Sequence, residues 1–195
     1  PAGRFRVKPD LPLMTFIGRL VGEKGADLLP EAIQFFLREG GQAAFVVLGT
    51  GNPWLENEFR RMSHAYPGYF DAALEYNEEL AHQLYAGSDF LLMPSRVEPC
   101  GLNQMYAMRY GTVPVVRGVG GLKDTVIDVG DPGGRGVQFQ QFTSHDAAIA
   151  IYRATQIYWN EEWLSGLRRH IMDIDFSWER SAARYLELYR EVAEV

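Results

Sequence analysis

The sequence predicts an α/β protein with a Rossmann-like, doubly wound parallel sheet, helices on both faces and a helical C-terminal tail. Two observations support this prediction. Short apolar runs alternate with amphipathic stretches along most of the 195 residues, and Gly or Pro bounds most of these runs, as is typical of buried parallel strands. The last third contains helical patterns without strands between them. Repeated strand–helix–strand units imply parallel strands joined by right-handed crossovers.

Six short segments are predicted as strands. They are rich in Val, Leu, Ile and Phe, a composition that favours burial on both faces of a sheet. The predicted strands are residues 13–17, 44–48, 70–74, 90–93 and 113–116, with a weaker candidate at 136–139.

The helices are predicted from apolar residues at helical spacing and from signals at their ends. Pro53 stands at a first-turn position, and Asn77 is a candidate N-cap. The predicted helices between the strands are residues 27–38, 54–65 and 78–86, one from near Gly101 to Tyr110, and one opened by the glycine-rich turn at residues 118–125.

The last three predicted helices are residues 145–159, 161–171 and 178–192. In the final one, apolar residues at helical spacing indicate a stripe that is buried against something: Trp178, Ala182, Tyr185, Leu186 and Tyr189. No linker is long enough to divide the chain. We therefore expect a single domain over residues 1–195, with a linker remnant at 1–12 and a C-terminal helix within 177–195.

Composition narrows the classes of function. The formal net charge of −6 argues against a broad nucleic-acid-binding face, and no apolar run reaches the length of a membrane span. The single Cys100 cannot form an intramolecular disulfide, and no Cys/His cluster indicates a metal site. We expect no nucleic acid, membrane, metal or cofactor, and a reducing compartment. Residues 1–6 lack an apolar signal core and an initiating Met, so we expect the chain to begin inside a longer protein.

The loop after the first predicted strand offers two cations, Arg19 and Lys24, between Gly18 and Gly25. Glycines let the backbone approach a ligand closely, and a helix N-terminus favours anions. The loop suits a diphosphate. It is equally consistent with a surface turn that carries two solvated cations.

A second glycine-rich loop, Gly49-Thr50-Gly51, follows the second strand. Taken alone, it is more simply interpreted as an ordinary turn before a helix. The first loop lacks the glycine fingerprint of dinucleotide-binding proteins, which argues against a dehydrogenase.

The loop after the fourth strand contains Glu98, just before a predicted helix. Its carboxylate could accept hydrogen bonds from vicinal sugar hydroxyls, and free amides from Gly101 to Asn103 could hold a phosphate. Glu98 could instead be a capping acid. A further glycine-rich turn, with Gly120 and Gly121, lies after the fifth strand, and four such loops above one sheet favour a ligand site.

The combined motifs closely resemble bacterial glycogen synthases and plant starch synthases. The resemblance runs from about Leu13 to the C-terminus. The matching segments are residues 95–104 followed by 107–114, residues 18–20 with 24–25, and residues 120–122 with 124–125.

This resemblance implies a GT-B architecture, in which two Rossmann-like domains face a cleft and this chain supplies the C-terminal one. Such enzymes transfer glucose from ADP-glucose to the non-reducing end of an α-1,4-glucan, with retention and without a metal. The family implies that Arg19 and Lys24 bind the diphosphate and stabilise the departing ADP. It implies that Glu98 holds donor hydroxyls and that Tyr76 stacks on adenine. The other implied substrate-binding residues are Gly18, Gly49, Thr50, Gly51, Cys100, Gly101, Leu102, Asn103, Gly120 and Gly121.

Two differences between this chain and the family pattern bear on the expected activity. Many related transferases carry a second glutamate eight residues after the first, where this chain has Tyr106; this agrees with the glycogen and starch synthase branch. The resemblance implies that the acceptor-binding domain lies N-terminal to this chain, so the chain alone is expected to be inactive. None of its four histidines lies in a matching context, and we expect each to be structural or solvent-facing.

Two alternatives to a donor-binding transferase domain follow from the sequence. A non-catalytic nucleotide- or glycan-binding module could keep the same fold. Such a module would not need to keep Arg19, Lys24 and Glu98 together, which favours the transferase domain. A generic nucleotide-binding enzyme such as a dehydrogenase fits less well still, since the dinucleotide fingerprint is absent. A cytoplasmic location, or a plastid one in a plant, is expected from the family.

Overall fold

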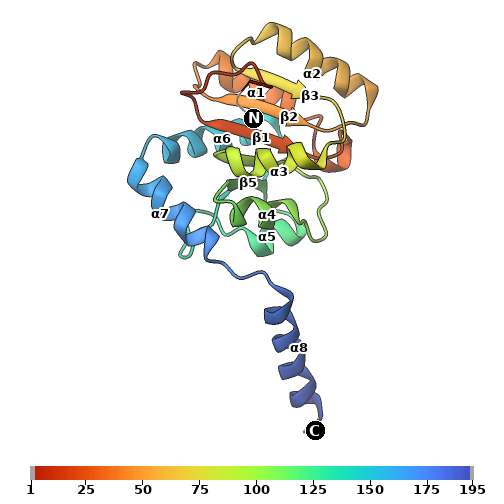
Figure 1. The fold of residues 1–195 in the computed structure, drawn as a ribbon, viewed down its shortest axis with the longest axis vertical. Helices are drawn as coiled ribbons and strands as arrows, with labels where there is room; N and C mark the ends of the chain where they lie inside the picture. Colours follow the sequence, from red (N-terminus) through yellow and green to blue (C-terminus); the bar gives the residue numbers. More distant parts are fainter. Residues whose placement is uncertain (1–2, 194–195) are drawn as a thin grey trace.

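The computed structural model describes residues 3–193, so the outermost two residues of the expected 1–12 and 177–195 segments lie outside the described part. Six parallel strands form one sheet in the order β3-β2-β1-β4-β5-β6 (Figure 1). They are β1 Leu13–Ile17, β2 Ala44–Leu48, β3 Phe70–Ala73, β4 Phe90–Met93, β5 Val113–Arg117 and β6 Val137–Phe139. The predicted Rossmann-like sheet is confirmed.

The helices also lie where the sequence predicted them. Asn52 and Asn77 accept hydrogen bonds at the starts of α2 and α3, as N-cap side chains do. The helices are α1 Leu29–Arg38, α2 Pro53–Ala65, α3 Glu78–Gly87, α4 Asn103–Arg109, α5 Gly120–Thr125, α6 Ser144–Tyr158, α7 Glu161–Met172 and α8 Trp178–Ala193, with a short 3-10 turn at Gly22–Lys24.

Two predicted helix starts are displaced. Helix α1 begins at Leu29 and not at residue 27. Helix α4 begins at Asn103 and not near Gly101, because Gly101 has a φ of +72°. That left-handed conformation cannot continue into a right-handed helix, and it leaves residues 99–102 as a loop.

Helices cover both faces of the sheet. Phe45 and Val47 of β2 belong to the main core, to which α1 and α2 contribute. Val46 points the other way and packs in a second cluster with Leu80 and Leu84 of α3. Because successive strand side chains alternate between faces, α3 lies on the opposite face from α1 and α2. Figure 1 shows α4 next to α3, and α5 next to α4.

The chain reverses its direction of strand addition between β1 and β4. Strand β1 pairs with β2 on one side, where Leu13 aligns with Ala44, and with β4 on the other, where Met14 aligns with Phe90. The loops after β1 and β4 therefore separate toward opposite faces and leave a crevice at the carboxyl ends of the strands, where ligands bind in open α/β sheets.

Helix α8 extends away from the rest of the fold (Figure 1). It has no buried residue, and its Trp178 and Tyr189 are 84% and 65% exposed. The apolar stripe predicted for this helix is present. Within residues 3–193, however, nothing covers it.

No helix in the described part of the chain combines the length and the apolar character that a membrane crossing requires.

Candidate functional site

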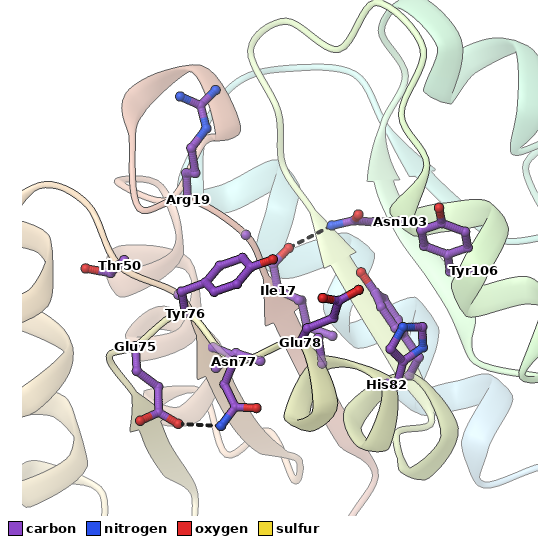
Figure 2. Close-up of a pocket in the computed structure, with 15 residues that line it drawn as sticks. Ile17, Arg19, Thr50, Glu75, Tyr76, Asn77, Glu78, His82, Asn103 and Tyr106 are labelled. Atoms are coloured by element: carbon purple, nitrogen blue, oxygen red, sulfur yellow. Dashed lines mark hydrogen bonds between the residues drawn. The ribbon is translucent and has the colours of Figure 1, made fainter.

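A cavity of about 340 Å³ opens at the carboxyl ends of β1 and β2, facing α3 and α4 (Figure 2). It lies near the reversal of strand order between β1 and β4, the topological switch point of the sheet, where ligands bind in open α/β sheets. We call it the large cavity, because a smaller one adjoins it. Its walls are Ile17, Gly18, Arg19, Leu48, Gly49, Thr50, Glu75, Tyr76, Asn77, Glu78, Ala81, His82, Tyr85, Asn103 and Tyr106.

The large cavity brings together six of the site residues expected from the sequence. Gly18 and Arg19 come from the loop after β1, and Gly49 and Thr50 from the loop after β2. Tyr76 is 84% exposed, and Figure 2 shows its ring reaching from the β3–α3 loop into the space between Arg19 and Glu78. Asn103 completes the set at the first turn of α4. An exposed aromatic ring on the wall of a cavity is available for stacking with a planar ligand.

A second, small cavity of about 50 Å³ adjoins the large one. The two share Ile17, Gly18 and Asn103, and the Asn103 amide donates a 2.8 Å hydrogen bond to the Ile17 carbonyl at this boundary. The remaining walls of the small cavity are Phe16, Lys24, Leu92, Met93, Ser95, Glu98, Gly101 and Leu102. A ligand with two connected parts could therefore occupy both cavities at once.

Lys24 and Glu98 form an ion pair on the wall of the small cavity. Lys24 Nζ lies 2.6 Å from Glu98 Oε2, which also accepts a 3.1 Å hydrogen bond from Ser95. Glu98 is only 6% exposed, and a buried carboxylate needs such partners to offset its lost hydration. No recorded hydrogen bond in residues 3–193 uses the other oxygen, Oε1, and this atom is not enclosed. It remains free to accept a hydrogen bond from a ligand.

The loop that carries Glu98 is held from behind by α5. The Gly121 amide donates to the Glu98 carbonyl at 3.0 Å, and a Cβ on Gly120 would lie 2.1 Å from that same oxygen. Only glycine permits this approach. Gly120 and Gly121 therefore support the loop and do not line either cavity; the exposed Cys100 also lies outside both walls.

Gln104 fixes the same loop from inside the fold. It is fully buried, and its amide nitrogen donates to the carbonyls of Cys100 and Gly101 and to the hydroxyl of Thr125. Its amide oxygen is buried without a partner. Within residues 3–193, no recorded hydrogen bond uses the backbone N–H of Gly101, Leu102 or Asn103. These amides match the donors that were expected to hold a phosphate.

Arg96 anchors the other side of this loop. Its guanidinium forms a bidentate pair with Asp27, with both N···O distances at 2.7 Å, and stacks 3.9 Å from the centre of the Phe142 ring. The hydrogen bond from Arg96 lowers the pKa of Asp27, although partial burial opposes this effect. The Ser95–Glu98 segment is thereby tied to the start of α1.

The loop after β2 is held by hydrogen bonds to α2, the helix that follows it. Glu56 of α2 accepts hydrogen bonds from the Thr50 hydroxyl at 2.6 Å and from the Gly51 amide at 3.1 Å. These two bonds, the first the stronger, lower the pKa of Glu56. Gly51 lines neither cavity, and a Cβ there would lie 2.5 Å from the Leu20 carbonyl. It permits the β1 and β2 loops to pack closely.

One wall of the large cavity was not predicted from the sequence. Glu78, Ala81, His82 and Tyr85 of α3 line it, so His82 contributes to a candidate site and is more than a structural or solvent-facing residue. Their spacing of three, four and seven residues places them on one helix face, beside the buried Leu80 and Leu84. These residues could have been found by examining the helix face next to the one that carries Leu80 and Leu84.

The family comparisons agree with this geometry. Residues 4–157 match the family described as glycosyl transferases group 1. The chain is 47% identical over 192 residues to the glycogen synthase of Flavobacterium johnsoniae, which covers 98% of this chain and 40% of that protein. It is 46% identical over 188 residues to the glycogen synthase of Thioalkalivibrio sulfidiphilus, covering 93% and 38%. The chain thus spans about 40% of the length of these relatives.

A solved structure is similar over nearly the whole chain. The catalytic domain of starch synthase IV from Arabidopsis thaliana, bound to ADP and acarbose, superimposes with a TM-score of 0.83 at 37% identity, over 97% of this chain and 41% of that one. The C-terminal domain of a group 1 glycosyl transferase from Francisella tularensis shares the fold, with a TM-score of 0.67 at 15% identity over 83% of each chain.

A parallel Rossmann-like sheet with a two-part cavity at its switch point is that of a GT-B glycosyltransferase domain, and the chain belongs to the glycosyl transferases group 1 family. Within that family it corresponds to the C-terminal domain of the glycogen and starch synthases.

Proposed function

We propose that this chain is the donor-binding half of an ADP-glucose-dependent glucosyltransferase that extends α-1,4-glucans with retention of configuration. The observation that carries the proposal is the connected pair of cavities. The large one offers an exposed ring and Arg19, and the small one offers a carboxylate with an open oxygen. The ADP bound to the related starch synthase supports the same choice of nucleotide.

In this proposal the nucleotide occupies the large cavity and the glucose the small one. Tyr76 stacks on adenine. Arg19 and Lys24 bind the diphosphate and stabilise the negative charge that develops on ADP as it leaves, a task suited to fixed cations. Glu98 accepts hydrogen bonds from glucose hydroxyls, and the amides of Gly101 to Asn103 bind the distal phosphate. No metal or other cofactor takes part.

Calorimetric titration with ADP, UDP and NAD in parallel tests the choice of nucleotide. We expect saturable binding that prefers ADP. Absence of binding at millimolar ADP, or a preference for NAD, would overturn the proposal and favour a module that has kept the fold without the donor site.

A second experiment tests the division of labour between two domains. We expect no transfer of glucose from ADP-glucose to glycogen by this chain alone, because an acceptor surface is proposed to lie in the remainder of the enzyme. Addition of the N-terminal half of a related glycogen synthase should produce measurable transfer. Turnover by the isolated chain would contradict the proposed need for a second domain.

A further inference from the structure

Glu98 presents a carboxylate oxygen near the place where the two proposed parts of the ligand meet, although its other oxygen pairs with Lys24. Both side chains line the small cavity, which joins the large one at Gly18 and Asn103. Lys24 Nζ lies 2.6 Å from Glu98 Oε2, so the pair is close to neutral as a unit. Glu98 Oε1 has no recorded partner in residues 3–193. This oxygen therefore presents carboxylate charge to whatever enters the small cavity.

A nucleoside diphosphate and its sugar ester differ at this boundary. The distal phosphate of ADP is the terminal group of a phosphoanhydride, and its last proton is lost with a pKa of about 6, as in a phosphate monoester, so it carries close to two negative charges above neutral pH. In ADP-glucose the same phosphate is esterified and carries one charge. In the proposed binding mode, the atom nearest the small cavity is an anionic oxygen in ADP and an ester oxygen followed by hydroxyl donors in ADP-glucose.

We propose that Glu98 sets the preference of this site for the nucleotide sugar over the free nucleoside diphosphate, an inference that rests on the proposed function. Its carboxylate accepts hydrogen bonds from the sugar hydroxyls, and it repels the terminal oxygen of ADP at short range. It also neutralises part of the Lys24 charge that would otherwise attract the diphosphate. The result is a site that holds the donor and releases the product.

The test compares the affinities of ADP and ADP-glucose in the wild type and in Glu98→Gln by calorimetry at pH 8. Glutamine keeps the size and one acceptor oxygen but removes the charge. The dissociation constant of ADP should fall, and that of ADP-glucose should rise, each on the order of three- to tenfold. The ratio of the two constants is the decisive quantity, since a general loss of folding would move both in the same direction.

Two further variants separate repulsion from simple positioning of Lys24. In a Lys24→Ala background, Glu98→Gln should again tighten ADP binding, because the repulsion acts without Lys24. If Glu98 only orients Lys24, the change should weaken ADP binding in the wild-type background and have no effect after Lys24→Ala. Glu31→Gln is the matched control: it removes an exposed carboxylate on α1 that lines neither cavity, and should leave the ratio unchanged.

Unchanged or weaker ADP binding by Glu98→Gln, in a protein whose wild type binds ADP, would overturn this inference and leave the proposed function standing. Failure of the wild type to bind either ligand would overturn both. An equal shift of the ratio in Glu31→Gln would reduce the effect to net charge and would also contradict the inference.

Discussion

Arg19 and Lys24 are both cations at the mouth of the site, but their surroundings differ. The Arg19 side chain is 70% exposed and lies 3.8 Å from Glu23, whereas Lys24 is 32% exposed and pairs closely with Glu98. We expect Arg19→Ala and Lys24→Ala each to weaken ADP binding by about 1.5–3 kcal/mol, the usual value of charge-assisted hydrogen bonds. Calorimetry measures both. Unchanged affinity for ADP in both variants would contradict the assignment of Arg19 and Lys24 to diphosphate binding.

A single carboxyl group, that of Asp27, makes the stability of the fold depend on pH. Arg96 lowers the pKa of this carboxyl group, so the ionised form stabilises the folded state. That stability is present above the unfolded pKa of about 3.9 and is lost as the pH falls through the lower folded pKa.

Asp27→Asn should therefore reduce the free energy of unfolding by about 1 kcal/mol at pH 7, a modest value because both side chains are partly exposed. The difference between variant and wild type should narrow as the pH falls below about 4. Urea unfolding across this range measures it. Asp124→Asn, which removes an exposed carboxylate outside the recorded ion pairs of residues 3–193, should show neither effect. A pH-independent difference for Asp27→Asn would contradict the assignment.

At the scale of the elements, one buried side chain, Gln104, holds the shape of the segment from Ser95 to Leu102. Gln104→Leu would leave the carbonyls of Cys100 and Gly101 without their shared donor. We expect it to lower the free energy of unfolding by about 1–3 kcal/mol and to weaken ADP-glucose binding, since the segment carries Glu98.

Chemical denaturation and calorimetry measure the two effects of Gln104→Leu. Gln83→Leu is the control, because Gln83 is exposed on α3 and its side chain, within residues 3–193, bonds only to Glu79, at 3.3 Å. It should change stability by less than about 0.5 kcal/mol. Wild-type affinity in Gln104→Leu would show that the segment holds its shape without this amide.

The elements show where sequence reasoning succeeds and where it stops. Strands β1, β2 and β4 were predicted to the residue, because each is a short apolar run between loop residues. The position of Gly120 and Gly121 behind the Glu98 loop could not be predicted, since it depends on how α5 packs against a loop twenty residues away. The ion pair of Lys24 with Glu98 was missed for the same reason: sequence separates them by 74 residues. Local chemistry identified both residues as site candidates, but only the fold brings them into contact.

At the scale of the whole molecule, α8 is the part with least connection to the rest. It buries no residue, so its removal should cost the sheet little. A chain ending at Phe176 should keep its thermal midpoint within about 2 °C of the full chain. Calorimetric scanning measures this.

Leu167→Ala provides the contrast in α7, where the leucine is 7% exposed and belongs to the core. It should cost about 2–5 kcal/mol and lower the midpoint by several degrees. A large drop on removing α8 would mean that this helix packs on the body of the domain in solution.

The switch point between β1 and β4 has a consequence for how the protein can be monitored. The large cavity is built from loops after β1 and β2, from α3 and from α4, so it exists only when strands from both halves of the sheet are paired. A partly unfolded chain has no binding site. Ligand binding is therefore linked to complete folding: ADP at one hundred times its dissociation constant should stabilise the domain by about 2.7 kcal/mol. The rise of the unfolding temperature with ADP concentration then reports occupancy of the site and integrity of the whole sheet in a single measurement.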